Sequence, residues 1–466
     1  MISVRVVAML AGAVGLAGCA SISDTPPEAR IVAPVVYAAD LPPAGLAEEW
    51  WKGFEDPALD ALVERGLAQN LDIAAAQERL RAAEAVLRAE RADRLPTIDG
   101  AAEVGVEAGD DSDGVTAEAG LFGLFDPDLS GRLAAEIRAA AAQYAEADYL
   151  RADQRRIVAA AIASQYVEYR RTGAQLVLLE ESTALQEQTL RIVTLRFEAG
   201  LAANLDVRRA AADLAQTRAL RGLIEIARAE AEHALAVLVA EPPGTLALPA
   251  GDGIDAIPAY GRGPEIGVPA DLLRRRADIL AAEARLAQAA AQVGIEQADL
   301  RPSLTIPGSI LLGDGTADGL FSGFLATLGA ALDLPLFDGG RRRAEVAAAD
   351  AELDARFAEY RQAFLLALGE AENALVAIGA YGERGEALAE AIEQSETALG
   401  QSNALYREGL ASLFDVLDAQ RQLISSRQSL LDNQADLSSA HIALHLAAAS
   451  SDTDGPSREQ AARGQP

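Results

Sequence analysis

Along most of the chain, apolar residues recur with the period of an α-helix, as in the run from Leu59 to Leu87. Two stretches, Gly131 to Glu198 and Arg341 to Glu408, run for 68 residues each without a proline, which corresponds to roughly 100 Å of α-helix. Glycines near Gly173 and between Gly379 and Gly385 predict local bends. Helices of this length cannot fold back into a compact monomer, so we expect coiled-coil-like partners along them.

Two other segments alternate apolar and polar residues, which is the pattern of a β-strand with one apolar face. In the first, Val104 and Val106 share one face and Glu103 and Glu107 the other. Each segment has a glycine-rich turn near its middle, so each predicts a β-hairpin. Strands of this length suit an outer-membrane barrel, and a pair of soluble hairpins packed on the helices is the alternative.

The chain contains two copies of one unit of roughly 200 residues. The segment Ala76–Ile98 resembles Ala282–Leu304 at an offset of 206, and Phe197–Ala202 resembles Tyr406–Ala411 at an offset of 209. An offset that drifts so little indicates a tandem duplication. The organisation we expect is a lipoprotein signal peptide (1–18), a lipidated extended tether (19–49), repeat unit 1 (50–240, with a hairpin at about 97–125), a linker (241–269), repeat unit 2 (270–450, with a hairpin at about 303–335) and a flexible C-terminal tail (451–466).

The number of strands predicts an oligomer. Four strands cannot close a barrel, because small barrels need about eight. An open strand edge in lipid leaves backbone groups unpaired, at a cost of several kcal/mol each. Two chains would supply eight strands and three chains twelve, so a membrane barrel requires several copies of the chain.

Composition narrows the class of protein further. The chain has 40 Lys and Arg against 70 Asp and Glu, for a net charge of −30, which excludes a basic footprint for nucleic acid. Half of the residues are hydrophobic, so an intrinsically disordered chain is excluded. Aromatic residues make up only 5%, and the abundance of Ala, Leu and Val favours long, closely packed helices.

The only cysteine of the chain, Cys19, follows a short apolar run that is too short for a stable transmembrane helix. The run ends in Leu16-Ala17-Gly18-Cys19, which resembles a bacterial lipoprotein processing site. Ala20 follows, rather than the Asp that usually retains such lipoproteins in the inner membrane. We therefore expect a lipid anchor on Cys19 in the outer membrane, the alternative being an ordinary signal peptide with a buried cysteine.

Several ordered motifs carry a resemblance to one family. They are Trp50-Trp51, Asn70-Leu71-Asp72, Leu272 to Ile279, Tyr406-Arg407-Glu408-Gly409 and Asp415 to Ala419. Together with the duplication and Cys19, they make the chain resemble the outer membrane factors, which are TolC-like channels, and within them the lipidated NodT/OprM-type branch. Ala277 departs from that branch, which usually has proline there.

The resemblance implies a mostly α fold with β-hairpins, in which a homotrimer forms a 12-stranded outer-membrane β-barrel continued by a periplasmic α-helical tunnel. It implies an exit duct of a tripartite efflux pump that conducts small molecules passively and is not an enzyme. Its partners would be a periplasmic adaptor protein and an inner-membrane transporter. The alternatives are a type I protein-secretion channel and a non-conducting coiled-coil lipoprotein.

The resemblance also assigns a periplasmic gate. Asp415 and Asp418 share one helix face, and threefold symmetry would turn them into two rings of carboxylates at a narrow mouth. The alternative is two solvated acids that favour a helix start. Tyr406 and Asp206 match positions that hold the helix pairs closed in the family. The family's basic residue in the loop after the glycine is missing, because Ala411 and Ser412 stand there.

The tips of the two helix pairs are expected at Gly200 and Leu201 and at Gly409 and Leu410, where glycine permits a tight reversal. The resemblance makes these tips the surface that meets the adaptor. Simple turn chemistry is the alternative, and the two are compatible.

Enzymatic chemistry finds no support in the motifs. His441 and His445 have the spacing of a helical metal-binding pair. The run lacks the acid of a zinc-protease motif and a third ligand, so solvated or interfacial histidines are the better interpretation. No phosphate loop or nucleophile elbow is present in the sequence. We expect no metal and no cofactor apart from the lipid on Cys19.

Overall fold

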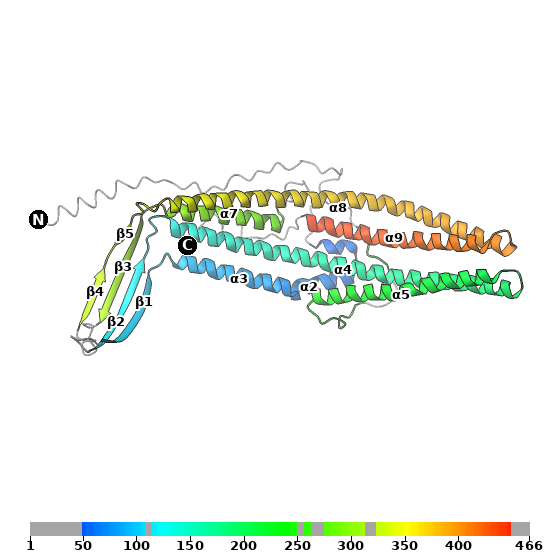
Figure 1. Cartoon of the computed structure of the whole chain (residues 1–466), viewed down its shortest axis with the longest axis horizontal. Coiled ribbons are helices and arrows are strands. Elements are labelled where there is room, and N and C mark those ends of the chain that lie inside the picture. Colours follow the sequence, from blue (N-terminus) through cyan, green and yellow to red (C-terminus); the bar gives the residue numbers. More distant parts are fainter. Residues whose placement is uncertain (1–48, 108–113, 249–255, 262–274, 313–322, 449–466) are drawn as a thin grey trace. The chain divides into compact units, whose positions relative to one another are not determined.

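The computed structural model describes residues 49–107, 114–248, 256–261, 275–312 and 323–448. The expected signal peptide, Cys19, almost all of the tether and the C-terminal tail lie outside the described residues. Figure 1 shows the order of the elements. They are η2 (Trp50–Phe54), α2 (Pro57–Gln69), α3 (Leu71–Ala92), β1 (Thr97–Glu107), β2 (Gly114–Phe125), α4 (Arg132–Glu198), α5 (Asn204–Leu238), α7 (Ala277–Ala298), β3 (Ser303–Leu312), β4 (Phe324–Leu328), β5 (Ala331–Asp333), α8 (Arg341–Glu408) and α9 (Leu413–Ala447).

Side chains with carboxylate or amide oxygens start several of the helices. Asp56 accepts hydrogen bonds from the first backbone N–H groups of α2, whose first residue is Pro57. Asn70 does the same for α3, Asp128 for α4 and Asp338 for α8. An acceptor at this position satisfies N–H groups that have no partner inside the helix. Polar residues just ahead of the apolar period therefore fix where these four helices begin.

The described residues divide into two compact units. Unit 1 is built from Ala83–Tyr144 and Glu283–Glu359, and unit 2 from Ile31–Ala82, Ala145–Ala282 and Tyr360–Pro466, taking the described residues of each range. Both repeats of the sequence contribute to both units. The long helices α4 and α8 each supply residues to both units as well.

In unit 1, the strands form one antiparallel sheet in the order β1-β2-β3-β4, with β5 paired to β3. The pairing of β2 with β3 joins the hairpin of the first repeat to that of the second. Within the described residues, β1 pairs with β2 alone and β4 with β3 alone. As far as the described residues extend, both outer edges of the sheet are therefore open in the single chain.

The register gives this sheet one continuous apolar face. Val104 lies opposite Ala117 and Ile310 opposite Ala326, with Leu121 opposite Ile310 in between. Acids and hydroxyls fall on the other face, where Glu103 is opposite Glu118 and Ser309 Oγ lies 2.7 Å from Thr327 Oγ1. The apolar side chains at the outer strands, Val104, Val106, Phe324 and Leu328, are strongly exposed.

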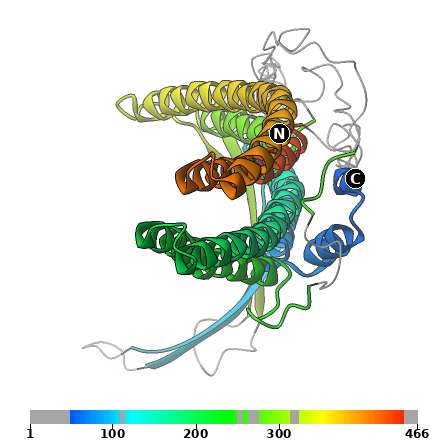
Figure 2. The ribbon, with the colours of Figure 1, turned by 90° about the vertical axis from the view of Figure 1, so that its right-hand side faces the viewer.

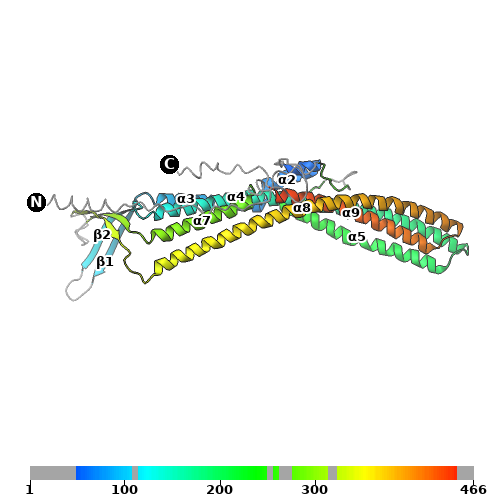
Figure 3. The ribbon, with the colours of Figure 1, turned by 90° about the horizontal axis from the view of Figure 1, so that it is seen from above.

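In unit 2, the chain forms two long helical hairpins, α4 with α5 and α8 with α9. Figures 1 and 3 show that the two helices of each pair run side by side to a common turn. Figure 2 shows the pairs end-on, one beside the other. Their main core lies where α2 and η2 pack on α4, α5 and α9, and its largest fully buried members include Tyr166, Ile162, Leu59 and Leu235.

A network of polar side chains fastens the N-terminal helices to α4. Asp56 Oδ2 accepts hydrogen bonds from Tyr166 Oη (2.9 Å) and from Arg170 Nη1 (2.7 Å). Arg170 Nη2 donates to the backbone carbonyl of Ala256 in the connector between the repeats (2.7 Å). Because Arg170 is buried, its charge depends on these acceptors. The carboxylate that starts α2 therefore also neutralises a buried cation.

Candidate functional site

The tips of the two helical hairpins are built in the same way. Gly200 and Gly409 have φ angles of 74° and 79°, which favour glycine. Each glycine donates its N–H to a carbonyl three residues back, and Leu201 and Leu410 donate to a carbonyl five residues back. This is the bonding pattern that ends helices with a left-handed residue. Both leucines are exposed, so each tip presents an apolar side chain at its turn.

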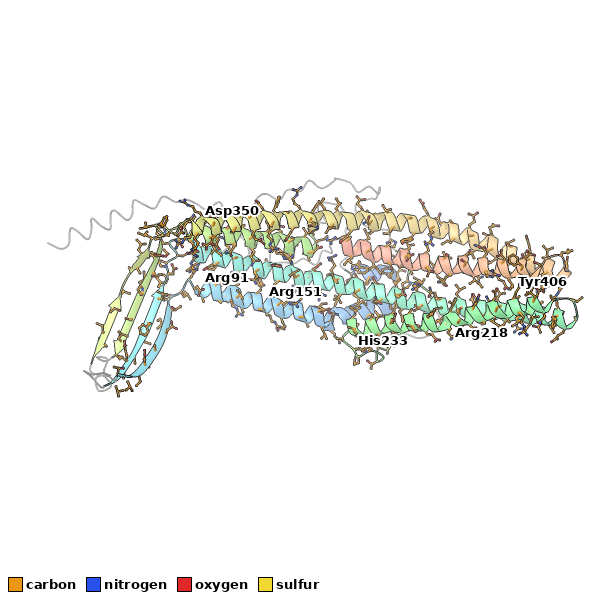
Figure 4. All side chains as sticks on the ribbon, viewed as in Figure 1. Arg91, Arg151, Arg218, His233, Asp350 and Tyr406 are labelled. Carbon is orange, nitrogen blue, oxygen red and sulfur yellow. The ribbon has the colours of Figure 1, made fainter. Side chains whose placement is uncertain are left out.

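A second hydrophobic cluster lies next to the tips and joins the two hairpins. It contains buried residues of all four helices: Val193 of α4, Ala210 of α5, Leu399 and Tyr406 of α8, and Leu413, Val416, Leu417 and Leu423 of α9. Figure 4 labels Tyr406 close to the turn between α8 and α9. The ends of the hairpins are therefore packed together within one chain.

Arg196 of α4 contacts Tyr406 directly, and no role for this arginine was predicted from the sequence. Its Nη1 donates to the backbone carbonyls of Tyr406 (2.8 Å) and Arg407 (3.3 Å). Its guanidinium carbon lies 4.6 Å from the centroid of the Tyr406 ring, which is cation–π geometry. A signal was present in the repeat alignment, because Leu405 stands in the second repeat where Arg196 stands in the first.

Asp206 lies in the first turn of α5 and is half-buried. Burial raises the pKa of Tyr406, the nearby Arg196 opposes that rise, and the charge of Asp206 adds to it. The Tyr406 hydroxyl has no hydrogen-bond partner among the described residues. The structure thus brings Asp206 and Tyr406 near one another without a hydrogen bond between them.

Asp415 and Asp418 are exposed in the first turns of α9. Asp415 Oδ2 accepts hydrogen bonds from the backbone N–H and the hydroxyl of Ser412, both at 2.8 Å, and the Asp415 N–H donates to the Ser412 hydroxyl. These bonds to Ser412 hold the pKa of Asp415 below its usual range. Asp415 therefore takes part in the N-terminal cap of α9, as the alternative interpretation of the two acids predicts. The exposed Asp418 has no such contact.

The two histidines of α9 are buried against aromatic rings. His445 stacks on Trp50 of η2, with ring centroids 5.2 Å apart, and His441 stacks on Tyr260 at 4.8 Å. Burial lowers the pKa of His441 to about 4 and that of His445 to about 3. No group of three metal-ligating side chains occurs in the part of the chain that the structure describes. The histidines lie at an interface between elements and are not solvated.

Comparison with known proteins shows which family shares this architecture. The family model described as outer membrane efflux protein matches residues 62–241 and 268–450. Nodulation protein T of Rhizobium leguminosarum bv. trifolii is 31% identical over 409 residues, which cover 85% of this chain and 86% of that protein. The pyoverdine export outer membrane protein OpmQ of Pseudomonas aeruginosa is 30% identical over 463 residues and 96% of each chain.

The fold agrees with solved structures of the same kind. The outer-membrane channel OprN superposes with a TM-score of 0.82 at 30% identity, over 91% of this chain and 98% of that one. The two matched segments of the family model confirm the duplication read from the sequence, and the mostly helical fold with β-hairpins is confirmed as well. The chain therefore belongs to the outer membrane efflux protein family, and it is an outer-membrane channel of an efflux pump rather than an enzyme.

Proposed function

We propose that three copies of the chain close a 12-stranded barrel in the outer membrane and conduct small molecules through it from the periplasm. The observation that carries this proposal is the sheet of unit 1, with its exposed apolar face and its open edges at β1 and β4. Lipid does not tolerate unpaired backbone groups, so each open edge needs the edge of another copy. The family resemblance favours three copies over two.

Exposed apolar side chains on the helices support the same assembly. Leu365, Leu366 and Val376 of α8 are exposed, as are Leu223 and Ile226 of α5. A part of α8 is apolar enough to cross a membrane by length and composition alone. Patches of this kind on a single chain mark contact surfaces. We assign them to packing between neighbouring copies around a helical tunnel.

The proposed substrates and partners follow from relatives. OpmQ is named for pyoverdine export, so a small exported molecule is the substrate class we propose. We assign the energy to an inner-membrane transporter and the connection to a periplasmic adaptor that meets the tips at Gly200, Leu201, Gly409 and Leu410. Type I protein secretion is the second candidate. A lipid on Cys19 would anchor the assembly in the outer membrane.

We place the gate at the tips of the hairpins. Asp415 and Asp418 would form two rings of carboxylates at the mouth, while Tyr406 and Asp206 hold the hairpins in the closed arrangement. The exposure of both acids and the burial of Tyr406 between hairpins support these assignments. Asp415 can serve both as the helix cap and as a charge at the mouth, since its carboxylate is exposed.

The proposal is tested with the full chain purified in detergent and added to planar lipid bilayers. Stepwise ion conductance supports a channel, and a protein that remains soluble without detergent and gives no steps contradicts it.

A matched pair of variants tests whether the apolar face of the sheet contacts lipid. Leu328→Arg puts a charge on the apolar face and should lower membrane insertion, because a charge there costs roughly 2–4 kcal/mol at mid-bilayer. Thr327→Arg puts the same charge on the polar face and should be tolerated.

A further inference from the structure

We propose that Arg196 helps to hold the α4–α5 hairpin against the α8–α9 hairpin at their tips, and that breaking its contact is a step in opening the channel. We call this arrangement, Arg196 with Tyr406 and Arg407, the tip contact. The inference rests on the proposed function, because the contact regulates transport only if the tips border the channel mouth.

The tip contact joins a cation to the end of a helix. Arg196 Nη1 donates to the carbonyls of Tyr406 and Arg407, which belong to the last turn of α8. Carbonyls in the last turn lack partners inside their own helix and carry the negative end of the helix dipole. The carbonyl of Tyr406 also accepts from the N–H of Gly409. The guanidinium thus binds the place where α8 ends and its turn begins.

The ring of Tyr406 completes the contact from the side. It is 8% exposed and lies 4.6 Å from the guanidinium carbon of Arg196. A planar guanidinium can stack on a ring and donate in its own plane at the same time, which lysine cannot do. This combination explains why arginine fits the position, and it predicts that lysine would replace only part of the contact.

The two repeats have diverged at this point. In the register of the duplication, Arg196 corresponds to Leu405, and Phe197 corresponds to Tyr406. Leu405 and Phe197 are 43% and 42% exposed, whereas Tyr406 is buried. The first repeat therefore supplies the cation, and the second supplies the ring and the carbonyls. The leucine side chain has no polar group for the reverse pairing, so within the described residues a polar contact of this kind forms in one direction only.

Beside the tip contact, the hairpins are joined by the buried apolar side chains of the second cluster and, further from the turns, by polar pairs such as Arg421 with Asp213 (3.4 Å). The apolar side chains have no alternative partner in water. The carbonyls of Tyr406 and Arg407 lie near the exposed turn, so water can replace the guanidinium there. The tip contact is consequently the polar part of the interface that lies at the turns, and it can exchange with solvent while the helices stay folded.

The experiment compares three variants of the full-length protein in planar bilayers. Arg196→Ala removes the guanidinium and is expected to raise the mean conductance several-fold. Arg196→Lys keeps a donor and a charge, and should restore conductance part of the way to the wild-type value. Arg191→Ala removes an exposed arginine five residues earlier on the same helix and should conduct like the wild type. Oligomer mass and thermal midpoint, measured in parallel, should remain unchanged in all three, which a merely structural role of Arg196 would not permit.

The outcomes separate this inference from the proposed function. If Arg196→Ala conducts like the wild type while Asp418→Ala conducts more, the channel stands and the role of Arg196 is wrong. If Arg196→Ala loses oligomers or thermal stability, Arg196 is structural and the inference is also wrong. If the wild type and every variant form oligomers but conduct no ions, the proposed function itself fails.

Discussion

The indole of Trp50 stacks on the imidazole of His445, with the ring centroids 5.2 Å apart and the ring planes 9° apart. Trp50 belongs to the first described helix and His445 to the last turn of α9. Tyr260, from the connector between the repeats, packs against both His441 and His445. Three segments far apart in the sequence thus meet at one pair of neutral histidines in unit 2.

This aromatic cluster makes the stability of unit 2 depend on pH. The pKa values of His441 and His445 are about 4 and about 3 in the folded chain, against 6.5 for an ordinary histidine. Because folding disfavours their protonated forms, the stabilisation is complete above pH 6.5 and is lost as pH falls toward these values. We expect each histidine to contribute a loss on the order of 3 kcal/mol by pH 4, so roughly 6 kcal/mol for the pair, measured as the free energy of unfolding in denaturant.

His233 supplies the matched control for this pH dependence. It is the third histidine of the chain, and it is exposed on α5; Figure 4 labels it. His445→Phe should flatten the change in unfolding free energy between pH 7.5 and pH 4, whereas His233→Phe should not. If the unfolding free energy changes equally with pH in the wild type and in His445→Phe, the assignment of this pH dependence to His445 is wrong.

Asp56 is expected to be the most sensitive acid of the N-terminal helices. Asp56→Ala leaves Arg170 as a buried cation that has lost its carboxylate and removes the cap of α2. Breaking a buried ion pair costs about 3–5 kcal/mol, and the lost cap about 1 kcal/mol more. Asp72→Ala, an exposed acid in the first turn of α3, is the control. Similar thermal midpoints for the two variants would argue against the network.

Two glycines should respond in opposite ways to alanine. A Cβ at Gly66 of α2 would overlap Ile162 Cδ1, which is fully buried, so Gly66→Ala should destabilise by about 1–3 kcal/mol. A Cβ at Gly222 of α5 meets no atom within 4 Å, so Gly222→Ala should stabilise by roughly 0.5–1 kcal/mol. The denaturant concentrations at the midpoints of unfolding measure both changes in stability. If Gly66→Ala leaves the stability unchanged, α2 can move away from α4.

The two acids at the start of α9 should differ when they are replaced. Asp418→Ala is expected to raise single-channel conductance and weaken block by divalent cations, because it removes one ring of charge at the proposed mouth. Asp415→Ala should do the same and also lose the Ser412 capping box, at about 1 kcal/mol of stability. Bilayer recordings at varied calcium concentration measure both. Unchanged conductance and block in Asp418→Ala would rule out the gate.

The secondary structure followed closely from the periodicity of the sequence. Alternation around Val104 predicted β1, and the proline-free stretch up to Glu408 predicted α8 with its end at the residue that the structure shows. The pairing of β2 with β3 could not be predicted in the same way, since alternation fixes the faces of a strand but not its neighbour.

The candidate site was less accessible from the sequence. The turns at Gly200 and Gly409 were predicted because a left-handed backbone conformation favours glycine. The partners of Arg196 are backbone carbonyls, which leave no mark in the sequence, so its contact with the end of α8 was missed. Of the two interpretations of His441 and His445, solvated or interfacial, the structure shows the interfacial one. The rings that cover them could not be predicted, because helical spacing shows which residues share a face but not which segment covers that face.

The mass of the detergent-solubilised complex, corrected for bound detergent, tests the central claim most directly. The open edges of the sheet require further copies of the chain, and the family resemblance favours three, so the particle should contain three chains, enough for twelve strands. A monomer that remains soluble without detergent would contradict the barrel, and with it the assignment of the apolar face to lipid.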